Sequence, residues 1–160
     1  MALDVNVALH DRYRFLWRRR YRAGQLNKAR VLLADDHPHF PEMEGRVLEP
    51  EFEVIGKVAN GLALFEEAMR LKPDVIVTDI SMPVLNGIDA VDRLVESGCN
   101  SRIVFLTVHS DFDFVRRCLS TGAFGYVVKS RMASELILAV REALAGHIFV
   151  SRQLQYKGKA

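Results

Sequence analysis

The sequence predicts an α/β fold in which helices cover both faces of a central parallel β-sheet. The first observation is a set of apolar runs that are rich in β-branched residues and too short for buried helices. They lie at residues 31–34, 75–78, 103–106 and 126–128. The second observation is that segments with helical spacing of apolar residues separate the runs. This alternation is typical of parallel strands that are joined by right-handed crossovers.

The predicted elements form five successive strand–helix units. They are a strand at 31–34, a helix at 41–48, a strand at 52–58, a helix at 61–71, a strand at 75–78, a helix from 88, a strand from 102, a helix after 111, a strand at 125–128 and a helix after 130. Asn60, Ser130 and either Ser110 or Asp111 are the predicted N-caps of three of these helices, because their side chains can accept from free amides. Gly45 weakens the first helix.

Reactive side chains follow four of the predicted strands directly. These residues are Asp35 with Asp36, Asp79, Thr107 and Lys129. The carboxyl ends of parallel strands meet at one edge of the sheet, where open α/β proteins build their sites. Any one of these acids could simply cap the following helix. Capping does not explain a threonine after the fourth strand together with a lysine after the fifth, so we expect one shared site.

The chemistry of this set points to transfer of a phosphoryl group. Three carboxylates that lie close together repel one another unless a cation is present. Mg²⁺ suits such a site, since it prefers hard oxygen ligands and is commonly held by one or two carboxylates together with phosphate oxygens. Asp79 can then attack phosphorus to give an acyl phosphate. Lys129 and Thr107 would bind the phosphoryl oxygens.

Composition limits the remaining classes of function. A chain of 160 residues with 49% hydrophobic residues fits one domain with a short appendage. No apolar run approaches the roughly 20 residues of a membrane span, and no signal peptide is evident, so we expect a cytoplasmic protein without membrane contact. Residues 1–30 carry a net charge of +6 and the rest −4. We therefore expect no direct nucleic-acid binding by the main domain.

Four segments resemble the receiver domain of bacterial two-component response regulators. They are residues 33–38 (Leu-Ala-Asp-Asp-His-Pro), 77–83 (Val-Thr-Asp-Ile-Ser-Met-Pro) with Asn86-Gly87, 105–107 (Phe-Leu-Thr) and 122–130 (Gly-Ala-Phe-Gly-Tyr-Val-Val-Lys-Ser). The similarity covers residues 29–151. It implies a flavodoxin-like, doubly wound (βα)5 sandwich with five parallel strands in the order 2-1-3-4-5. It also implies a signalling switch in a phosphorelay and not an enzyme.

The resemblance assigns roles to the reactive residues. A sensor histidine kinase or a phosphotransfer protein would phosphorylate Asp79, and Thr107 and Lys129 would bind the phosphoryl group. The implied Mg²⁺ ligands are Asp35, Asp36, Asp79 and the main-chain carbonyl of Ser81. Thr107 and Tyr126 match the switch pair, which alters the surface formed by the last two helices and the fifth strand. A homodimer through that surface is a common outcome in the family. Alternatively, Tyr126 is half-buried strand filler.

Ser130 is a departure from many receivers, which have a proline after the lysine. A serine there puts a cis peptide in doubt, because cis bonds before other residues cost roughly 3 kcal/mol. Serine-containing versions resemble the subfamily that usually carries a LuxR-type helix-turn-helix domain. The residues after 151 are too few for one, so we expect a stand-alone receiver or a truncated DNA-binding transcriptional regulator. A Mg²⁺-dependent phosphatase of the haloacid dehalogenase type is a further alternative, but it needs an acid where Ser81 stands.

The termini and three histidines lie outside this core pattern. Residues 1–28 form a basic leader, which is compatible with an amphipathic helix. Alternatively, the leader results from a miscalled start upstream of Leu26. Residues 152–160 form a polar tail. His37 and His39 make an H-x-H pair, which is a poor metal site without a third ligand. His109 lies near the mouth of the pocket, where the resemblance suggests that it tunes loss of the phosphoryl group. Otherwise it is an exposed loop histidine.

Overall fold

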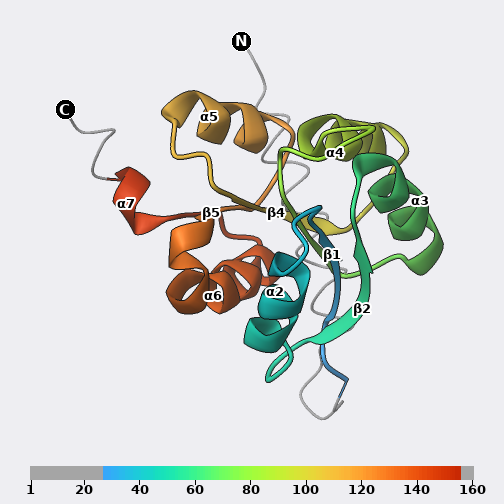
Figure 1. The fold of residues 1–160 in the computed structure, drawn as a ribbon, viewed down its shortest axis with the longest axis horizontal. Coiled ribbons are helices and arrows are strands. Elements are labelled where there is room, and N and C mark those ends of the chain that lie inside the picture. The colour runs from blue at the N-terminus through green and yellow to red at the C-terminus, as the bar shows by residue number, and fades with distance from the viewer. Residues whose placement is uncertain (1–26, 156–160) are drawn as a thin grey trace.

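A six-stranded parallel sheet runs through the centre of the protein in the order β2-β1-β3-β4-β5-β6 (Figure 1). The computed structural model describes residues 27–155. The strands are β1 (Arg30–Ala34), β2 (Glu53–Val58), β3 (Val75–Thr78), β4 (Arg102–Thr107), β5 (Gly125–Val128) and β6 (Phe149–Val150). The order of the first five confirms the predicted flavodoxin-like sheet, and the short sixth strand is an addition that the sequence analysis did not foresee.

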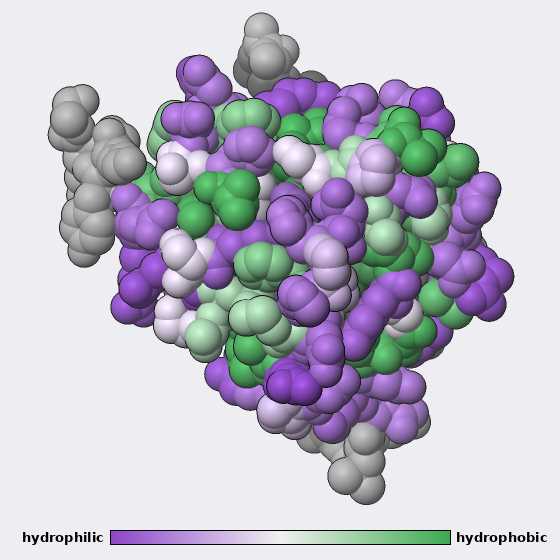
Figure 2. Space-filling view, in the orientation of Figure 1, coloured by the Kyte–Doolittle hydropathy of each residue, from purple (hydrophilic) through white to green (hydrophobic). Residues whose placement is uncertain are grey.

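Helices cover both faces of the sheet, as predicted. They are α2 (Phe40–Leu48), α3 (Gly61–Leu71), α4 (Gly87–Glu96), α5 (Phe112–Ser120), α6 (Met132–Ala145) and the short α7 (Arg152–Gln155), with a single 3₁₀ turn, η1 (Lys129–Arg131). Figure 1 shows α2 and α6 on one face and α3, α4 and α5 on the other. The face that is seen in that orientation mixes hydrophilic residues with smaller apolar areas (Figure 2).

Two apolar layers hold the helices to the sheet. Successive residues of a strand point to opposite faces, so Leu32 packs in the layer beneath α3, α4 and α5, whereas Leu33 packs in the layer beneath α2 and α6. Every residue of β3, β4 and β5 is buried. Burial on both faces explains why these strands read as continuous apolar runs.

The predicted helix caps are only partly correct. Asn60 does cap α3, since its side chain accepts from the amide of Ala63 at 2.8 Å. Asp111 occupies the N-cap position of α5 without a side-chain hydrogen bond. The predicted cap at Ser130 is wrong, because Ser130 lies inside η1 and Arg131 takes the N-cap position of α6. The described residues contain no cis peptide bond, so the bond before Ser130 is trans.

The segment that follows α6 is more structured than a polar tail. Residues 149–150 form β6 and residues 152–155 form α7, whose Leu154 is only 1% exposed. The boundaries of the predicted domains, at 1–28, 29–151 and 152–160, stay predictions, and residues 1–26 of the basic leader lie outside the described residues. None of the helices in residues 27–155 has the length and apolar content that crossing a lipid bilayer requires.

Candidate functional site

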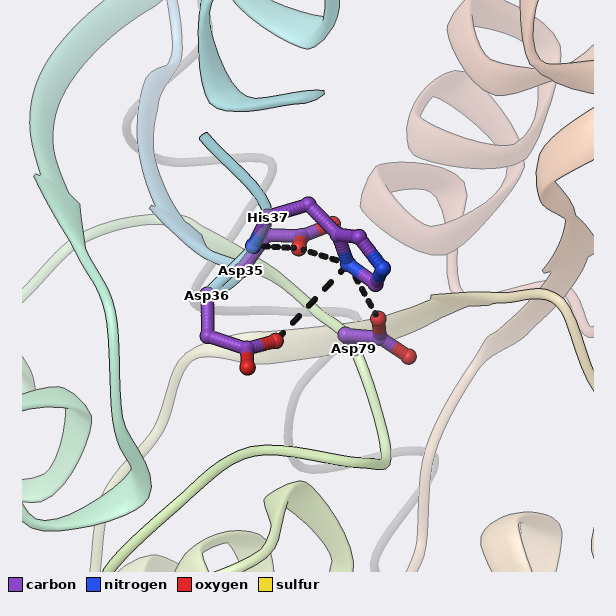
Figure 3. Close-up of side chains that lie close together, drawn as sticks. All are labelled: Asp35, Asp36, His37 and Asp79. Atoms are coloured by element: carbon purple, nitrogen blue, oxygen red, sulfur yellow. Dashed lines mark hydrogen bonds and ion pairs between the residues drawn. The ribbon is translucent and has the colours of Figure 1, made fainter. Parts of the chain in front are cut away.

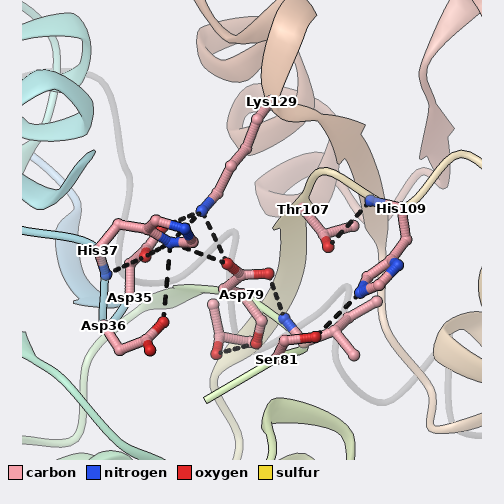
Figure 4. A network of polar contacts seen from close by, with 10 residues as sticks. Asp35, Asp36, His37, Asp79, Ser81, Thr107, His109 and Lys129 are labelled. Atoms are coloured by element: carbon pink, nitrogen blue, oxygen red, sulfur yellow. Dashed lines mark hydrogen bonds and ion pairs between the residues drawn. The ribbon is translucent and has the colours of Figure 1, made fainter. Parts of the chain in front are cut away.

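The strand ends bring the predicted reactive residues together at one edge of the sheet (Figure 4). Asp35 follows β1 and its amide donates to the carbonyl of Val58, while the amide of Asp79, which follows β3, donates to the carbonyl of Ala34. These main-chain bonds continue the sheet to the two carboxylates and fix where they lie. Thr107 ends β4 and Lys129 follows β5.

Asp79 is buried at the centre of this group, and its two oxygens have different surroundings. Oδ1 accepts a hydrogen bond from the amide of Ile80 at 2.6 Å. Oδ2 lies 2.7 Å from Nζ of Lys129. The carboxylate is therefore held by a main-chain donor at one oxygen and by the ammonium group at the other.

Lys129 bridges two carboxylates inside the protein. Its Nζ lies 2.7 Å from Oδ2 of Asp79 and 2.6 Å from Oδ2 of Asp35. The ammonium also lies 4.1 Å from the centre of the Phe40 ring. Burial disfavours the charged amine, but the hydrogen bonds and charges of the two carboxylates outweigh it, so the pKa of Lys129 is raised.

An acidic cluster lies beside this lysine (Figure 4), and Figure 3 shows its four side chains from close by. Ligand atoms of Asp35, Asp36, His37 and Asp79 all lie within 4.8 Å of one another. The three carboxylates supply the hard oxygen donors that Mg²⁺ prefers, and Oδ2 of Asp35 and Oδ2 of Asp79 already face a positive charge, the ammonium of Lys129. The residues that are present therefore fit the predicted Mg²⁺ site.

His37 belongs to this cluster, although the sequence analysis gave it little weight. Its Nδ1 lies 3.0 Å from Asp35, 3.7 Å from Asp36 and 3.9 Å from Asp79. Its main-chain amide also donates to Asp35 at 2.9 Å. An imidazole is a softer donor than a carboxylate, so we assign it to the rim of a Mg²⁺ site. His39 is not in the cluster and occupies the N-cap position of α2.

Glu44 is a fourth carboxyl group near the site, and the sequence analysis missed it. It lies on the inner face of α2 and is 1% exposed. Burial, together with the nearby charge of Asp35, raises its pKa to about 9. Burial also acts on Asp35, but hydrogen bonds from Lys129, His37 and Glu44 and the charge of Lys129 lower the pKa of that residue. A glutamate at a core position of an otherwise apolar helix stripe was the signal in the sequence.

Replacing Glu44 by leucine should stabilise the protein most at high pH. The folded pKa of about 9 exceeds the ordinary value of 4.5, so the unfolded chain releases this proton first, and wild-type stability falls as the pH rises between those values. We expect a gain of about 1–4 kcal/mol in the free energy of unfolding at pH 8 and little gain at pH 5, measured by urea denaturation. Glu42→Leu, on the exposed side of the same helix, is the control. A gain that is equal at both pH values would contradict the buried, protonated state.

Thr107, together with Ser81 and His109, forms the other side of the site (Figure 4). Thr107 is fully buried, and its Oγ1 accepts from the amide of His109 at 3.4 Å. Oγ of Ser81, two residues beyond Asp79, lies 2.9 Å from Nε2 of His109. The His109 ring stacks on Phe114 with 4.3 Å between the ring centres. His109 is thus a fixed part of the loop between β4 and α5, which differs from the exposed loop histidine that was the alternative.

Tyr126 is completely buried, with 0% exposure, so the alternative of a half-buried strand residue is wrong. Its hydroxyl donates to the main-chain carbonyl of His109 at 2.8 Å. Burial is the main reason that the pKa of this phenol is raised. This hydrogen bond therefore links β5 to the loop that carries His109 and that directly follows Thr107.

The start of α4 packs against the main chain of Asp79 through its first residue, Gly87. A Cβ on Gly87 would lie 1.8 Å from the carbonyl oxygen of Asp79, so no larger residue fits here. The amide of Gly87 donates to the carbonyl of Ile80 at 2.7 Å. In the loop between β3 and α4, Val84 has a left-handed backbone conformation (φ 70°) and is 77% exposed. This conformation is costly for a β-branched residue.

Comparisons with known proteins agree with this geometry. The family described as "Response regulator receiver domain" matches residues 31–141. The chain is 36% identical over 126 residues to the transcriptional regulatory protein DegU of Brevibacillus brevis, covering 78% of this chain and 53% of DegU. It is 34% identical over 128 residues to the nitrate/nitrite response regulator NarL of Escherichia coli K12, covering 79% and 59%. The chain thus spans just over half the length of these relatives.

Solved structures give the same result. The structure of a LuxR-family two-component response regulator from Aurantimonas sp. SI85-9A1 superposes with a TM-score of 0.77 at 30% identity, covering 81% of this chain and 94% of that one. The signal receiver domain of the putative NarL of Mycobacterium tuberculosis gives a TM-score of 0.72 at 28% identity, covering 76% and 99%. With its sheet order and the acidic pocket at Asp35, Asp36 and Asp79, this chain belongs to the family of response regulator receiver domains.

Proposed function

We propose that the protein accepts a phosphoryl group on Asp79 from a sensor histidine kinase or a phosphotransfer protein, as the switch of a two-component phosphorelay. The observation that carries this proposal is the 2.7 Å contact between Oδ2 of Asp79 and Nζ of Lys129 inside the acidic cluster. A buried carboxylate whose one oxygen is held by a main-chain amide presents the other oxygen to an incoming phosphorus.

The residues divide the chemistry among them. Oδ2 of Asp79 forms the new bond to phosphorus as the bond to the donor nitrogen breaks, and the departing imidazole keeps that electron pair and takes up a proton. The ammonium of Lys129 and the hydroxyl of Thr107 bind the phosphoryl oxygens. Asp35, Asp36, Asp79 and the main-chain carbonyl of Ser81 would hold Mg²⁺, which when bound neutralises charge on those oxygens.

The consequence that we propose is a change of the surface formed by α5, β5 and α6. Thr107 and Tyr126 both bond to His109, one through its amide and one through its carbonyl. A Thr107 hydroxyl that turns to a phosphoryl oxygen gives up its bond to the His109 amide, and the loop then repacks against Tyr126. We propose that this change controls a homodimer through the same surface.

A second candidate is that the chain acts as the receiver part of a transcriptional regulator. DegU and NarL are named as regulators, and the chain covers little more than half of each. By contrast, a phosphatase of the haloacid dehalogenase type has no support at the position that would need an acid, because Ser81 stands there and its hydroxyl is bonded to His109.

Phosphorylation by a small donor tests the proposal. The full chain is incubated with acetyl phosphate and MgCl₂ or with acetyl phosphate and EDTA, and the intact mass is measured. We expect a phosphoryl adduct only with Mg²⁺, and borohydride reduction followed by peptide mapping should place it on Asp79. An adduct on another residue, or an adduct that forms equally well in EDTA, would overturn the assignment.

A further inference from the structure

The seven residues Phe149–Gln155, which comprise β6 and α7, form a strap along the outer edge of β5. The pairing is parallel, with Phe149 opposite Gly125 and Val150 opposite Tyr126. The amide of Phe149 donates to the carbonyl of Phe124 at 2.8 Å, and the amide of Ser151 donates to the carbonyl of Tyr126 at 2.9 Å. The strap therefore donates hydrogen bonds to main-chain carbonyls along the outer edge of β5, the strand that carries Tyr126.

Ser151 anchors the strap through a buried polar contact. Its Oγ accepts from the amide of Val128 at 2.9 Å and donates to Oε2 of Glu135 at 2.6 Å. Glu135 is buried on α6, and its other oxygen lies 3.3 Å from the amide of Arg152. Breaking this contact would leave the buried carboxylate of Glu135 and the buried amide of Val128 with fewer hydrogen-bond partners. This cost favours the one position of the strap in which both groups are bonded.

The strap also completes the core on the side of Tyr126. Leu154 is almost fully buried in the same apolar layer as Tyr126, and Val150 packs against that layer. The strap thus contacts β5 through its main chain and through the layer in which the switch tyrosine lies. It occupies the β5 edge of the surface formed by α5, β5 and α6.

The seat of the strap is one residue from the phosphoryl site. Val128, which bonds to Ser151, directly precedes Lys129. A phosphoryl group on Oδ2 of Asp79 has no room within the 2.7 Å that now separates this oxygen from Nζ of Lys129. The ammonium must therefore shift, and its contacts with Asp35 and the Phe40 ring limit the directions in which it can move. The part of this shift that the side chain of Lys129 does not absorb acts on the main chain at the end of β5, where Val128 bonds to the strap.

We propose that phosphorylation of Asp79 weakens docking of the Phe149–Gln155 strap on β5, so that the strap releases the edge of the strand in the phosphorylated state. This inference rests on the proposed function of Asp79. Because coupling between two events is reciprocal, a weakened strap must also make the phosphorylated state easier to reach.

Hydrogen exchange measured by mass spectrometry tests the strap directly, with beryllofluoride and Mg²⁺ as the phosphoryl mimic. We expect the amides of the strap to exchange about fivefold faster or more when the mimic is bound, with no change in Asp79→Asn. Ser151→Ala removes the anchor and should tighten mimic binding, measured by calorimetry, by several-fold. Leu154→Ala should do the same, whereas Ser134→Ala, an exposed serine of α6, should not.

The outcomes separate the strap from the function on which it depends. If calorimetry shows that the mimic binds while strap exchange stays unchanged or slows, the strap proposal is overturned and the phosphoacceptor remains. If the mimic does not bind to the wild type, both proposals fail. If Ser151→Ala speeds strap exchange but leaves the affinity for the mimic unchanged, the coupling is absent and the strap is only structural.

Discussion

Asp79→Asn is expected to reduce phosphorylation by acetyl phosphate to background. The amide keeps the shape of the side chain, but its nitrogen or carbonyl oxygen is a far weaker nucleophile than a carboxylate oxygen. The variant also lacks the negative charge that lies 2.7 Å from Lys129. The measurement is the fraction of adduct in the intact mass after incubation with the donor and MgCl₂, compared with the wild type over the same time.

The fold of this variant should survive, which makes the loss specific. Lys129 keeps its 2.6 Å ion pair with Asp35, and repulsion within the acidic cluster falls. We therefore expect its free energy of unfolding to remain within about 1–2 kcal/mol of the wild type. Asp113→Asn, an exposed aspartate of α5, is the control and should be phosphorylated normally. If Asp79→Asn accepted the phosphoryl group at the wild-type rate, the nucleophile would have to be another residue.

The placement of the site could be predicted because it follows from topology alone. Once β1, β3, β4 and β5 are recognised as parallel strands, the residues that come after them must share one edge. Asp35, Asp79, Thr107 and Lys129 therefore needed no knowledge of side-chain packing. The order of the first five strands, by contrast, came from the family resemblance and was confirmed by the structure.

What the sequence analysis missed depends on packing between distant segments. Glu44 stands in an otherwise apolar stripe of α2, but only the placement of that helix beside the site shows that its carboxyl group is buried near Asp35. The part of the strap at residues 152–155 reads as the start of a polar tail, because only Leu154 there is apolar. The hydrogen bonds of Ser151, just before it, go to Tyr126 and Val128, which lie more than twenty residues earlier. Ser130 failed as a cap because the chain first makes a 3₁₀ turn.

Lys129→Met should be the most destabilising single change in the site. It leaves Asp35 and Asp79 buried without their shared cation, and breaking a buried ion pair on one side typically costs about 3–5 kcal/mol. Methionine has a similar length and no charge, so the loss comes mainly from electrostatics. We expect this deficit in the free energy of unfolding at pH 7 with EDTA, measured by urea denaturation. Lys57→Met, at an exposed position of β2, is the control.

Added Mg²⁺ and a lower pH should each reduce the loss of stability in Lys129→Met. The two tests together distinguish an electrostatic cause of the loss from poor packing of the methionine side chain. Because Mg²⁺ is expected to bind the folded variant and not the unfolded chain, the free energy of unfolding of the variant should rise with the concentration of MgCl₂.

Lowering the pH should also reduce the difference in the free energy of unfolding between the variant and the wild type. The lowered pKa of Asp35 stabilises the wild type above the ordinary value of 3.8, and that contribution is lost as the pH falls through the folded pKa. This contribution is smaller in the variant, because the hydrogen bond and charge of Lys129 no longer lower the pKa of Asp35. If the loss in the free energy of unfolding were the same with and without Mg²⁺ and at every pH, poor packing of the methionine side chain would be its cause. Lys129 would then not be the charge that stabilises the acidic cluster.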